Sequence, residues 1–182
     1  MRFDFVVLGA TGMQGKIVSR DLLENKYSVL LCGRDKSRVE DILKKYRRCE
    51  FVYFDARDSN GIVKVIKNSG ADVIVNCVEG DWNLKILESC IKANVNSIDL
   101  GSDIPMTKEQ LNLDSELKKK NIVHITGCGS VPGIGNVMLR YAVEKFDKIN
   151  SVDVGFAWDS NVKKFVVPFS IESITEEFVS PA

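Results

Sequence analysis

The stretch VVLGATGMQGK, residues 6–16, places glycines at positions 9, 12 and 15 directly after an apolar run. Glycine loses more conformational freedom on folding than any other residue, so a cluster of three requires a structural reason. A turn that leads from a strand into a helix provides that reason. In such a turn Gly9 permits the tight bend, Gly12 lets the backbone approach a pyrophosphate, and Gly15 lets the helix pack closely on the sheet.

A helix that begins after this turn would present free N–H groups and a partial positive charge to phosphates. The glycines here are three residues apart at both steps, whereas the commoner dinucleotide-binding pattern spaces them by two and then three. The loop is therefore a variant of that pattern. It favours a dinucleotide site over a purely structural turn, with the binding residues Gly9, Ala10, Thr11, Gly12, Met13, Gln14 and Gly15.

Short apolar runs alternate with segments of helical apolar spacing along most of the chain. Expected strands are 3–8, 28–32, 51–54, 72–78, 97–100 and 122–126. Between them, helical spacing predicts buried positions such as Ile17 in the first helix and Leu111 in the last. This alternation predicts a doubly wound parallel sheet, the Rossmann fold, with strands covered by helices on both faces.

The pattern changes after about residue 148, which predicts a dinucleotide-binding domain over 1–148 and the beginning of a second α/β domain over 149–182. KINSVDVGFAW (148–158) and KKFVVPF (163–169) have the pattern of strands with no helix between them, and SIESITEEFVS (170–180) that of a short helix. The second region is too short for a complete domain, so we expect a truncated substrate or dimerisation domain.

Composition indicates a soluble globular protein, with 45% hydrophobic and 27% charged residues. The 25 basic and 25 acidic side chains cancel, which favours neither a nucleic-acid nor a membrane partner. Five cysteines without a C-x-x-C pair predict reduced thiols in a cytoplasmic protein, with no disulfide framework and no metal site. The N-terminus opens directly into a strand without a basic, then apolar leader, which predicts no secretion.

The end of the second predicted strand, LLCGRDKSR (30–38), bears on cofactor choice. Sites that prefer NAD place an acidic residue about 20 positions beyond the glycines, whereas Arg34 lies 19 residues after Gly15 (34 − 15). A guanidinium there can bind a 2′-phosphate with paired hydrogen bonds, so NADP is favoured, with Gly33 and Ser37 beside it. The neighbouring Asp35 keeps NAD possible, and the alternative is a solvated turn that caps the next helix.

Two further strand ends are expected in the same crevice, because ligands of such sheets bind at the carboxyl ends of strands. Asp55 ends the third strand and is expected near the adenine amino group. Asn76, Cys77 and Val78 end the fourth and are expected near the nicotinamide ribose.

Several motifs together resemble the saccharopine dehydrogenase (reductase) family, including its lysine-dehydrogenase-like members. They are GATGMQG (9–15), VIVNCVEG (73–80), CIKANVNSIDLGSD (90–103) and ITGCGSVPGIGNVM (125–138), and VPFSIESITEEFVSPA (167–182) is similar to the start of that family's second domain. The resemblance implies a nicotinamide-dependent oxidoreductase of amino-acid metabolism that acts on the C–N bond of an amino acid or its imine. It also implies a homodimer when full length.

Hydride transfer at a C–N bond requires a group that donates a proton to the imine nitrogen or accepts one from the amine. The loop DLGSD (99–103) makes Asp99 and Asp103 candidate catalytic residues, and Ser102 and Asp103 candidate substrate contacts. The alternative is that Asp103 caps a helix and Asp99 orients the loop. Pro132 and Gly133 are weaker candidates for substrate contact, because they are similar to the family's Pro-Gly helix entry.

Other candidates have plainer interpretations. His124, the only histidine, lies in a predicted covered strand and is expected to be a hydrogen-bonded core residue, with a catalytic base as the alternative. Cys128 is expected to be a small buried residue, with a substrate-facing position as the alternative. Tyr141 and Lys145, with Ser130 upstream, match the pair of short-chain dehydrogenases, but they follow the sixth strand and not the fifth. Tyr141 also continues the apolar stripe of Ile134, Val137 and Met138, so packing is expected to explain it. A further alternative is a non-catalytic module that binds NADP and regulates a partner.

Overall fold

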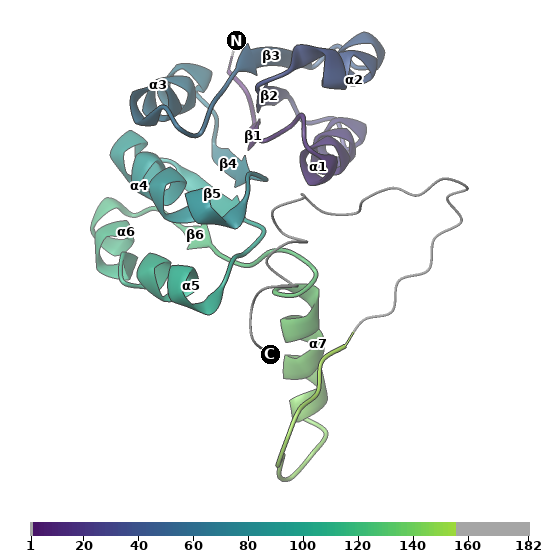
Figure 1. The fold of residues 1–182 in the computed structure, drawn as a ribbon, viewed down its shortest axis with the longest axis vertical. Helices are drawn as coiled ribbons and strands as arrows, with labels where there is room; N and C mark the ends of the chain where they lie inside the picture. Colours follow the sequence, from purple (N-terminus) through teal and green to yellow (C-terminus); the bar gives the residue numbers. More distant parts are fainter. Residues whose placement is uncertain (1, 156–182) are drawn as a thin grey trace. The chain divides into compact units, whose positions relative to one another are not determined.

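The computed structural model describes residues 2–155, and within them six strands form one parallel sheet (Figure 1). Its order is β3-β2-β1-β4-β5-β6, the doubly wound arrangement, so the predicted fold class is confirmed. The strands are β1 (Phe5–Leu8), β2 (Val29–Gly33), β3 (Cys49–Tyr53), β4 (Val73–Asn76), β5 (Asn96–Asp99) and β6 (His124–Ile125).

Register aligns the carboxyl ends of these strands. Leu8 pairs with Cys32 on one side and Asn76 on the other, and Asn76 in turn pairs with Asp99. The order of connection reverses between β1 and β4. In doubly wound sheets the loops after the two strands at such a reversal border the ligand-binding crevice.

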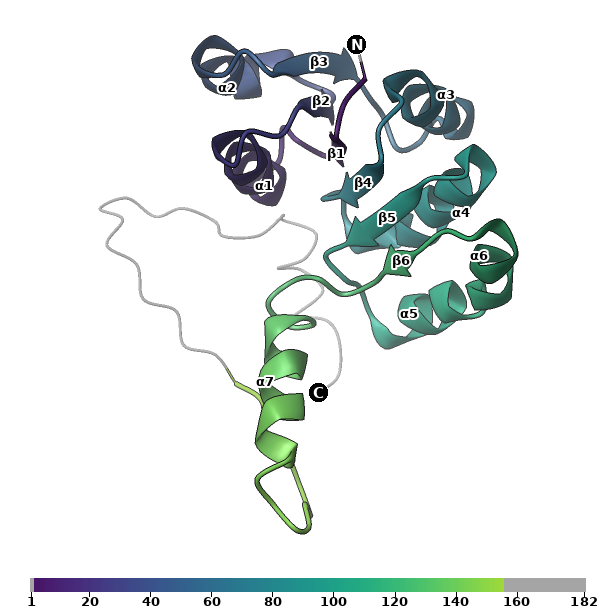
Figure 2. The ribbon, with the colours of Figure 1, turned by 180° about the vertical axis from the view of Figure 1, so that it is seen from behind.

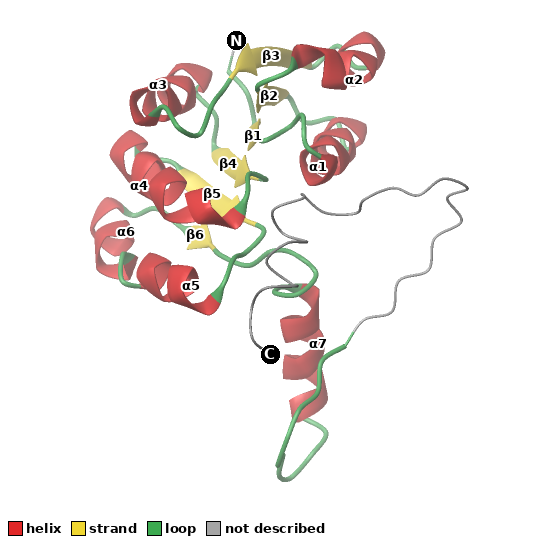
Figure 3. Ribbon diagram, in the orientation of Figure 1, coloured by secondary structure: helices red, strands yellow, loops and turns green. Residues whose placement is uncertain are grey.

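Helices connect the strands and lie on both faces of the sheet (Figures 2 and 3). They are α1 (Met13–Glu24), α2 (Glu40–Lys45), α3 (Ser59–Ser69), α4 (Asn83–Ala93), α5 (Ile104–Leu111), α6 (Asp114–Lys120) and α7 (Ile134–Val143). Two short 3₁₀ helices, Lys36–Val39 and Gly80–Trp82, precede α2 and α4. The sheet and these helices belong to one compact unit that ends at Lys148.

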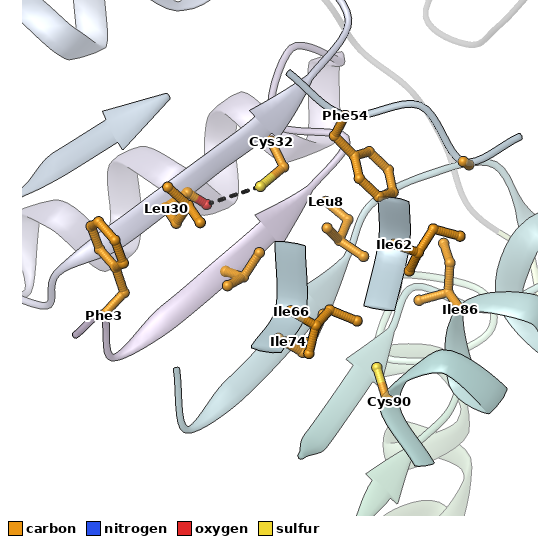
Figure 4. Packing of buried hydrophobic residues seen from close by; sticks show 12 residues of the cluster. Phe3, Leu8, Leu30, Cys32, Phe54, Ile62, Ile66, Ile74, Ile86 and Cys90 are labelled. Atoms are coloured by element: carbon orange, nitrogen blue, oxygen red, sulfur yellow. Dashed lines mark hydrogen bonds between the residues drawn. The ribbon is translucent and has the colours of Figure 1, made fainter. Parts of the chain in front are cut away.

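Alternate residues of the central strands form two separate cores, because successive strand side chains point to opposite faces. On one face Leu8 and Ile74 pack with Ile62 of α3 and Ile86 of α4 (Figure 4). The opposite face is packed against α1 and α2 and includes Val7, Leu31, Val75, Leu23 and Ile42. The central strands are therefore covered on both faces, as their Val- and Ile-rich runs predict.

The edge of the sheet differs from this expectation. β6 contains only two residues, and Val123 and Ile125 beside and within it are 60% and 53% exposed. Within residues 2–155, β6 is thus covered on one face, where Ile122 packs with Leu87 and Ile91 of α4. Within the described residues this edge strand therefore differs from the strands of the sheet centre, which are covered on both faces.

Two predicted buried helix positions are also exposed. Ile17 in α1 is 52% exposed, because the helix turns Gly15, Ser19 and Leu23 toward the sheet. Leu111 is 60% exposed, because the last helical segment is divided into α5 and α6 and Leu113 and Leu117 pack from the second.

The region after α7 is described as far as residue 155, and residues 148–155 contain no strand. The remainder of the predicted strand 148–158, the strand 163–169 and the helix 170–180 lie outside the described residues. No helix among the described residues combines the length and apolarity needed to cross a membrane.

Candidate functional site

The loop between β1 and α1 is held by backbone contacts to both neighbouring strands. The Ala10 N–H donates to the Cys32 carbonyl of β2 at 2.9 Å. Gly9 has a φ of +78°, and a Cβ on it would lie 2.7 Å from the Cys77 carbonyl oxygen after β4. Only glycine satisfies both conditions, so Gly9 makes the tight turn that the sequence predicts.

The three glycines of the loop differ in what surrounds them. A Cβ on Gly15 would overlap the Gly9 carbonyl group, so Gly15 is required for close packing of α1 on the loop. A Cβ on Gly12 would instead meet a single atom within 4 Å, the Gly9 carbonyl oxygen at 3.2 Å. That contact is close, and apart from this one oxygen the space in front of Gly12 is open.

This open space faces the start of α1. Gly12 is the N-cap residue of the helix, and no side chain caps its first turn within the described part of the chain. Met13 and Gln14 are exposed there. Uncapped N–H groups, a partial positive charge and a bare backbone fit a pyrophosphate.

The end of β2 places an arginine beside this loop. Gly33 is buried, and a Cβ on it would overlap the side chain of Thr11, which is itself 8% exposed. Arg34 follows and is exposed. These contacts keep the end of β2 against the glycine loop and leave the guanidinium accessible.

The acidic neighbour of Arg34 has a local role. The Asp35 carboxylate accepts hydrogen bonds from the Ser37 hydroxyl at 2.7 Å and the Ser37 N–H at 3.0 Å, which caps the 3₁₀ helix. These bonds, with smaller effects of Arg38 and Lys16, lower the pKa of Asp35. The capping alternative is thus realised by Asp35, and the neighbouring Arg34 is exposed.

Asp55, after β3, is bound by an arginine two residues on. The Arg57 guanidinium donates from Nε at 3.0 Å and 3.1 Å and from Nη2 at 2.5 Å to the two carboxylate oxygens. Hydrogen bonds from the Arg57 side chain and backbone hold the pKa of Asp55 well below its usual range. Asp55 therefore presents a paired carboxylate at this strand end.

Of the three residues predicted at the end of β4, Cys77 and Val78 follow the strand and lie beside Gly9 across the reversal point of the sheet. Asn76 is buried, its Nδ2 donates to Asn83 Oδ1 at 2.7 Å, and its Oδ1 accepts from the Val78 N–H at 3.1 Å. The structure thus brings the ends of β1 and β4 together, with Asn76 beneath the loop surface.

Asp99, a candidate catalytic residue, is 1% exposed. Its Oδ1 accepts from the N–H groups of Gly101 at 2.8 Å and Gly127 at 2.9 Å and from the Thr126 hydroxyl at 3.2 Å. Its Oδ2 lies 2.7 Å from Gln110 Nε2 and 3.2 Å from His124 Nε2. This burial and occupancy favour the alternative in which Asp99 orients loops.

Burial alone would raise the pKa of Asp99. The hydrogen bonds from His124, Gly127 and Gln110 prevail and lower it to about 2. The carboxylate therefore remains ionised in the folded protein at neutral pH.

Asp103 differs from Asp99 in that it is exposed. Its carboxylate accepts from the Met106 N–H at 2.8 Å and caps α5, as the capping alternative predicts. Half-buried Ser102 packs against Gly80, and Pro132 packs against Gly101. Gly133 begins the turn into α7 with a φ of +132°.

His124 is a hydrogen-bonded core residue, as predicted. Its side chain is 7% exposed, and its Nδ1 lies 2.8 Å from the Ser97 hydroxyl. The expectation for Cys128 is wrong: this residue is exposed, because it lies in the loop beyond the two residues of β6 that pair with β5.

The tyrosine and lysine of α7 lie close together, with Lys145 Nζ 5.1 Å from the Tyr141 ring centroid. Tyr141 is 68% exposed, and Ile134, Val137 and Met138 are 57%, 64% and 65% exposed. Packing therefore does not account for Tyr141 within the described residues. The pair follows β6, one unit later than the short-chain arrangement requires.

Three polar residues that hold the loops were not indicated by any sequence pattern. Asn83, Gln110 and Thr126 join the ends of β4, β5 and β6 through side-chain hydrogen bonds. Asn83 and Gln110 are 2% exposed, and a buried polar residue in a helix is the available signal, but burial itself is not visible in one sequence.

A sequence profile described as the saccharopine dehydrogenase NADP binding domain matches residues 5–125, from the first residue of β1 to the last of β6. The chain belongs to this family. NADP is therefore its cofactor, and the open space at Gly12 fits that group. The resemblance carried by the sequence motifs is confirmed.

Relatives of this family member include carboxyaminopropylagmatine dehydrogenase of Synechocystis sp., 24% identical over 160 residues, with 82% of this chain and 40% of the relative covered. Carboxynorspermidine synthase of Vibrio alginolyticus is 28% identical over 162 residues, with 78% and 38% covered. The chain thus spans well under half the length of these relatives.

Among solved structures, apo saccharopine dehydrogenase (L-Glu forming) from Saccharomyces cerevisiae shares the fold with a TM-score of 0.67. It is 17% identical, and the match covers 79% of this chain and 31% of that one. This similarity supports the doubly wound fold of the saccharopine dehydrogenase domain.

Proposed function

We propose that the loop Gly9–Gly15 binds the pyrophosphate of NADP at the start of α1. The observation that carries this proposal is the open space in front of Gly12, in contrast to the filled space beside Gly9 and Gly15. Packing explains two of the glycines, and a ligand explains the third. The uncapped first turn of α1 supports the same function, because its N–H groups and partial charge favour an anion.

The adenosine half of the cofactor is proposed to lie over the ends of β2 and β3. Exposed Arg34 would bind the 2′-phosphate, since its neighbour Asp35 is bound to Ser37. The ion pair of Asp55 and Arg57 would border the adenine. Cys77 and Val78, across the reversal point from Gly9, would meet the nicotinamide ribose.

The complete protein is proposed to be an NADP-dependent oxidoreductase that acts at a C–N bond. Family membership supports this activity, and the names of two relatives, a dehydrogenase and a synthase, denote carboxylated amines. In the reductive direction an imine carbon gains a hydride and its nitrogen gains a proton, which yields an amine. NADPH supplies the hydride when bound.

The substrate would meet the loops after β5 and β6, next to the nicotinamide end of the crevice. Ser102, Asp103, Pro132 and Gly133 are the proposed contacts. Among them Asp103 is an exposed carboxylate at the start of α5 and could pair with a cationic amine. Its capping hydrogen bond uses one oxygen and leaves the other available.

The proposal is tested with the full-length protein, by following absorbance at 340 nm with NADPH or NADH and pairs of an amine and a 2-oxo acid. Oxidation of NADPH that depends on both organic substrates is expected. Tight NADPH binding without turnover for any pair would instead indicate a regulatory module. No binding of any dinucleotide would refute the site.

We also propose a second domain, an oligomeric state and a cellular location for the full-length protein. Residues 149–182 would begin a substrate and dimerisation domain, and the full-length protein would be a homodimer, which light scattering can test. The balanced charge and unpaired cysteine pattern favour a cytoplasmic enzyme of amino-acid metabolism, which fractionation of the source cells can test.

A further inference from the structure

A chain of buried hydrogen bonds connects the loop after β4 with the loop after β5. Asn76 Nδ2 donates to Asn83 Oδ1 at 2.7 Å, and Asn83 Nδ2 donates to the Gly101 carbonyl at 3.1 Å. Both asparagines are 2% exposed. Each of the two asparagine amides donates one hydrogen bond and accepts another, so together they fix the distance between the two loops.

The Asp99 carboxylate continues this chain to the loop after β6. One oxygen accepts from the N–H of Gly101 and the N–H of Gly127, which belong to different loops. The Cys128 N–H donates to the Asp99 carbonyl at 2.8 Å. A single residue at the end of β5 therefore connects both flanking loops through its side chain and its backbone.

The second carboxylate oxygen of Asp99 is held by side chains of α5 and β6. Gln110 of α5 and His124 of β6 both reach it, and Thr126 lies 3.1 Å from Gln110 Oε1. Every buried side-chain nitrogen and oxygen in the described part of the chain has a hydrogen-bond partner. A fully satisfied network of this kind is rigid, because moving one member leaves others unpaired.

Close packing against three glycines also joins the three loops. A Cβ on Gly101 would overlap Pro132, and a Cβ on Gly80 would overlap the Ser102 side chain. A Cβ on Gly129 would lie 2.5 Å from the Leu100 carbonyl oxygen. Ser102 and Pro132, two proposed substrate contacts, are thus held in place by loops that Asp99 connects.

We infer that Asp99 is a positioning residue that fixes the loops after β5 and β6 in the arrangement needed at the nicotinamide end of the cofactor crevice. The inference rests on the proposed function, because the carboxyl ends of these strands are the side of the crevice assigned to nicotinamide and substrate. The network does not include Gly12, Arg34 or Asp55, which are assigned to the pyrophosphate and adenosine. Loss of Asp99 should therefore affect the two ends of NADP differently.

The test uses the full-length protein, with Asp99→Asn and two probes. NADPH contains the nicotinamide and fluoresces when bound, whereas adenosine 2′,5′-bisphosphate lacks the nicotinamide. Asparagine keeps the shape but offers an NH₂ group to donors, so one side of the network fails. We expect NADPH to bind about tenfold more weakly with altered emission, and the bisphosphate affinity to change less than about threefold.

Asp4→Asn is the matched control, because Asp4 also accepts from a neighbouring residue, Ser28, but at the amino end of the sheet. It should change stability without changing the NADPH emission. If Asp99→Asn does not fold, Thr126→Val removes a single donor to the same carboxylate and should change NADPH binding in the same direction.

Equal weakening of both probes, or weakening of neither, would overturn the inference, since a purely structural carboxylate would not distinguish the two ends of the cofactor. A wild-type protein that binds neither probe would refute the proposed function itself. The two failures are therefore distinct.

Discussion

The loop after β1 is held mainly by backbone contacts, whereas the loops after β4, β5 and β6 are held by buried polar side chains. The first loop can form because Gly9 and Gly15 have no side chain that would overlap the neighbouring backbone. Asp99 joins the loops after β5 and β6, because its carboxylate accepts hydrogen bonds from Thr126 and Gly127, which are 27 and 28 residues further along the chain.

The two kinds of loop suit different tasks, namely binding the pyrophosphate and positioning the reacting carbon. A bare backbone with uncapped N–H groups can bind the pyrophosphate, which is the same in every dinucleotide. Positioning a reacting carbon needs a more exact arrangement, because small displacements reduce the rate strongly. A rigid buried network is suited to that requirement.

The largest expected effect is that of Gly15→Ala on folding. The new Cβ would overlap the Gly9 carbonyl group, and backbone on both sides cannot yield. We expect a loss of roughly 3–4 kcal/mol in the free energy of unfolding, measured in urea. A loss below about 1 kcal/mol would show that the loop is not held by close packing.

Gly12→Val should affect binding more than folding. Its Cβ would lie 3.2 Å from the Gly9 carbonyl oxygen, a close contact with that one atom, and the φ of −80° suits any residue. We expect NADPH affinity to fall by about a hundredfold or more, roughly 3 kcal/mol, in calorimetry. Unchanged affinity in a folded variant would contradict a pyrophosphate at this position.

Arg34→Ala tests the proposed contact between the Arg34 guanidinium and the 2′-phosphate of NADP. A charged hydrogen bond to the 2′-phosphate would be lost, so NADPH binding should weaken by about 1–3 kcal/mol while NADH binding hardly changes. Arg47→Ala is the control, since Arg47 is also exposed but precedes β3 at its amino end. Equal losses for both cofactors would remove the assignment of Arg34.

The buried network should appear in the acid stability of the protein. Asp99 has a pKa of about 2 in the fold against an ordinary 3.8, so it stabilises the folded state by on the order of 2 kcal/mol above pH 4. That contribution is lost as the pH falls from about 4 through about 2. Asp99→Asn should therefore show a shallower fall in unfolding free energy than wild type over this range, in urea titrations; parallel curves would contradict the lowered pKa.

The smallest effect is expected for Tyr141→Phe. Loss of a tyrosine that donates the reacting proton would cost about 10²–10⁴ in rate. Because Tyr141 lies on exposed α7 after β6, we expect NADPH oxidation by the full-length protein to remain within about twofold. A large loss would restore the short-chain type of mechanism.

Local patterns predicted the backbone of the glycine loop. The tight turn at Gly9 and the close packing of Gly15 both follow from residues within one strand, one turn and one helix. The capping of α5 by Asp103 is local in the same way, because the acceptor and donor are three residues apart.

The buried hydrogen-bond network could not be predicted from such patterns. Asn83 and Gln110 are polar residues in helices, and nothing near them in the chain indicates that they face Asn76 and Asp99. The exposure of Ile125, Tyr141 and the rest of the α7 stripe was missed for a related reason, since apolar spacing shows which residues share a face but not what covers it.

By itself, the amino-acid sequence determined the alternation of strands and helices and the glycine turn, because these depend on residues close together in the chain. The family was also determined by the sequence, through several short motifs that follow one another in a fixed order. Tertiary structure alone decided that Asp99 is buried among Gly101, Gly127 and Gln110, and that one face of β6 is exposed within residues 2–155. The physical reason is that burial and hydrogen-bond partners of a side chain depend on segments far away in the chain, whose arrangement is fixed only when the sheet is assembled.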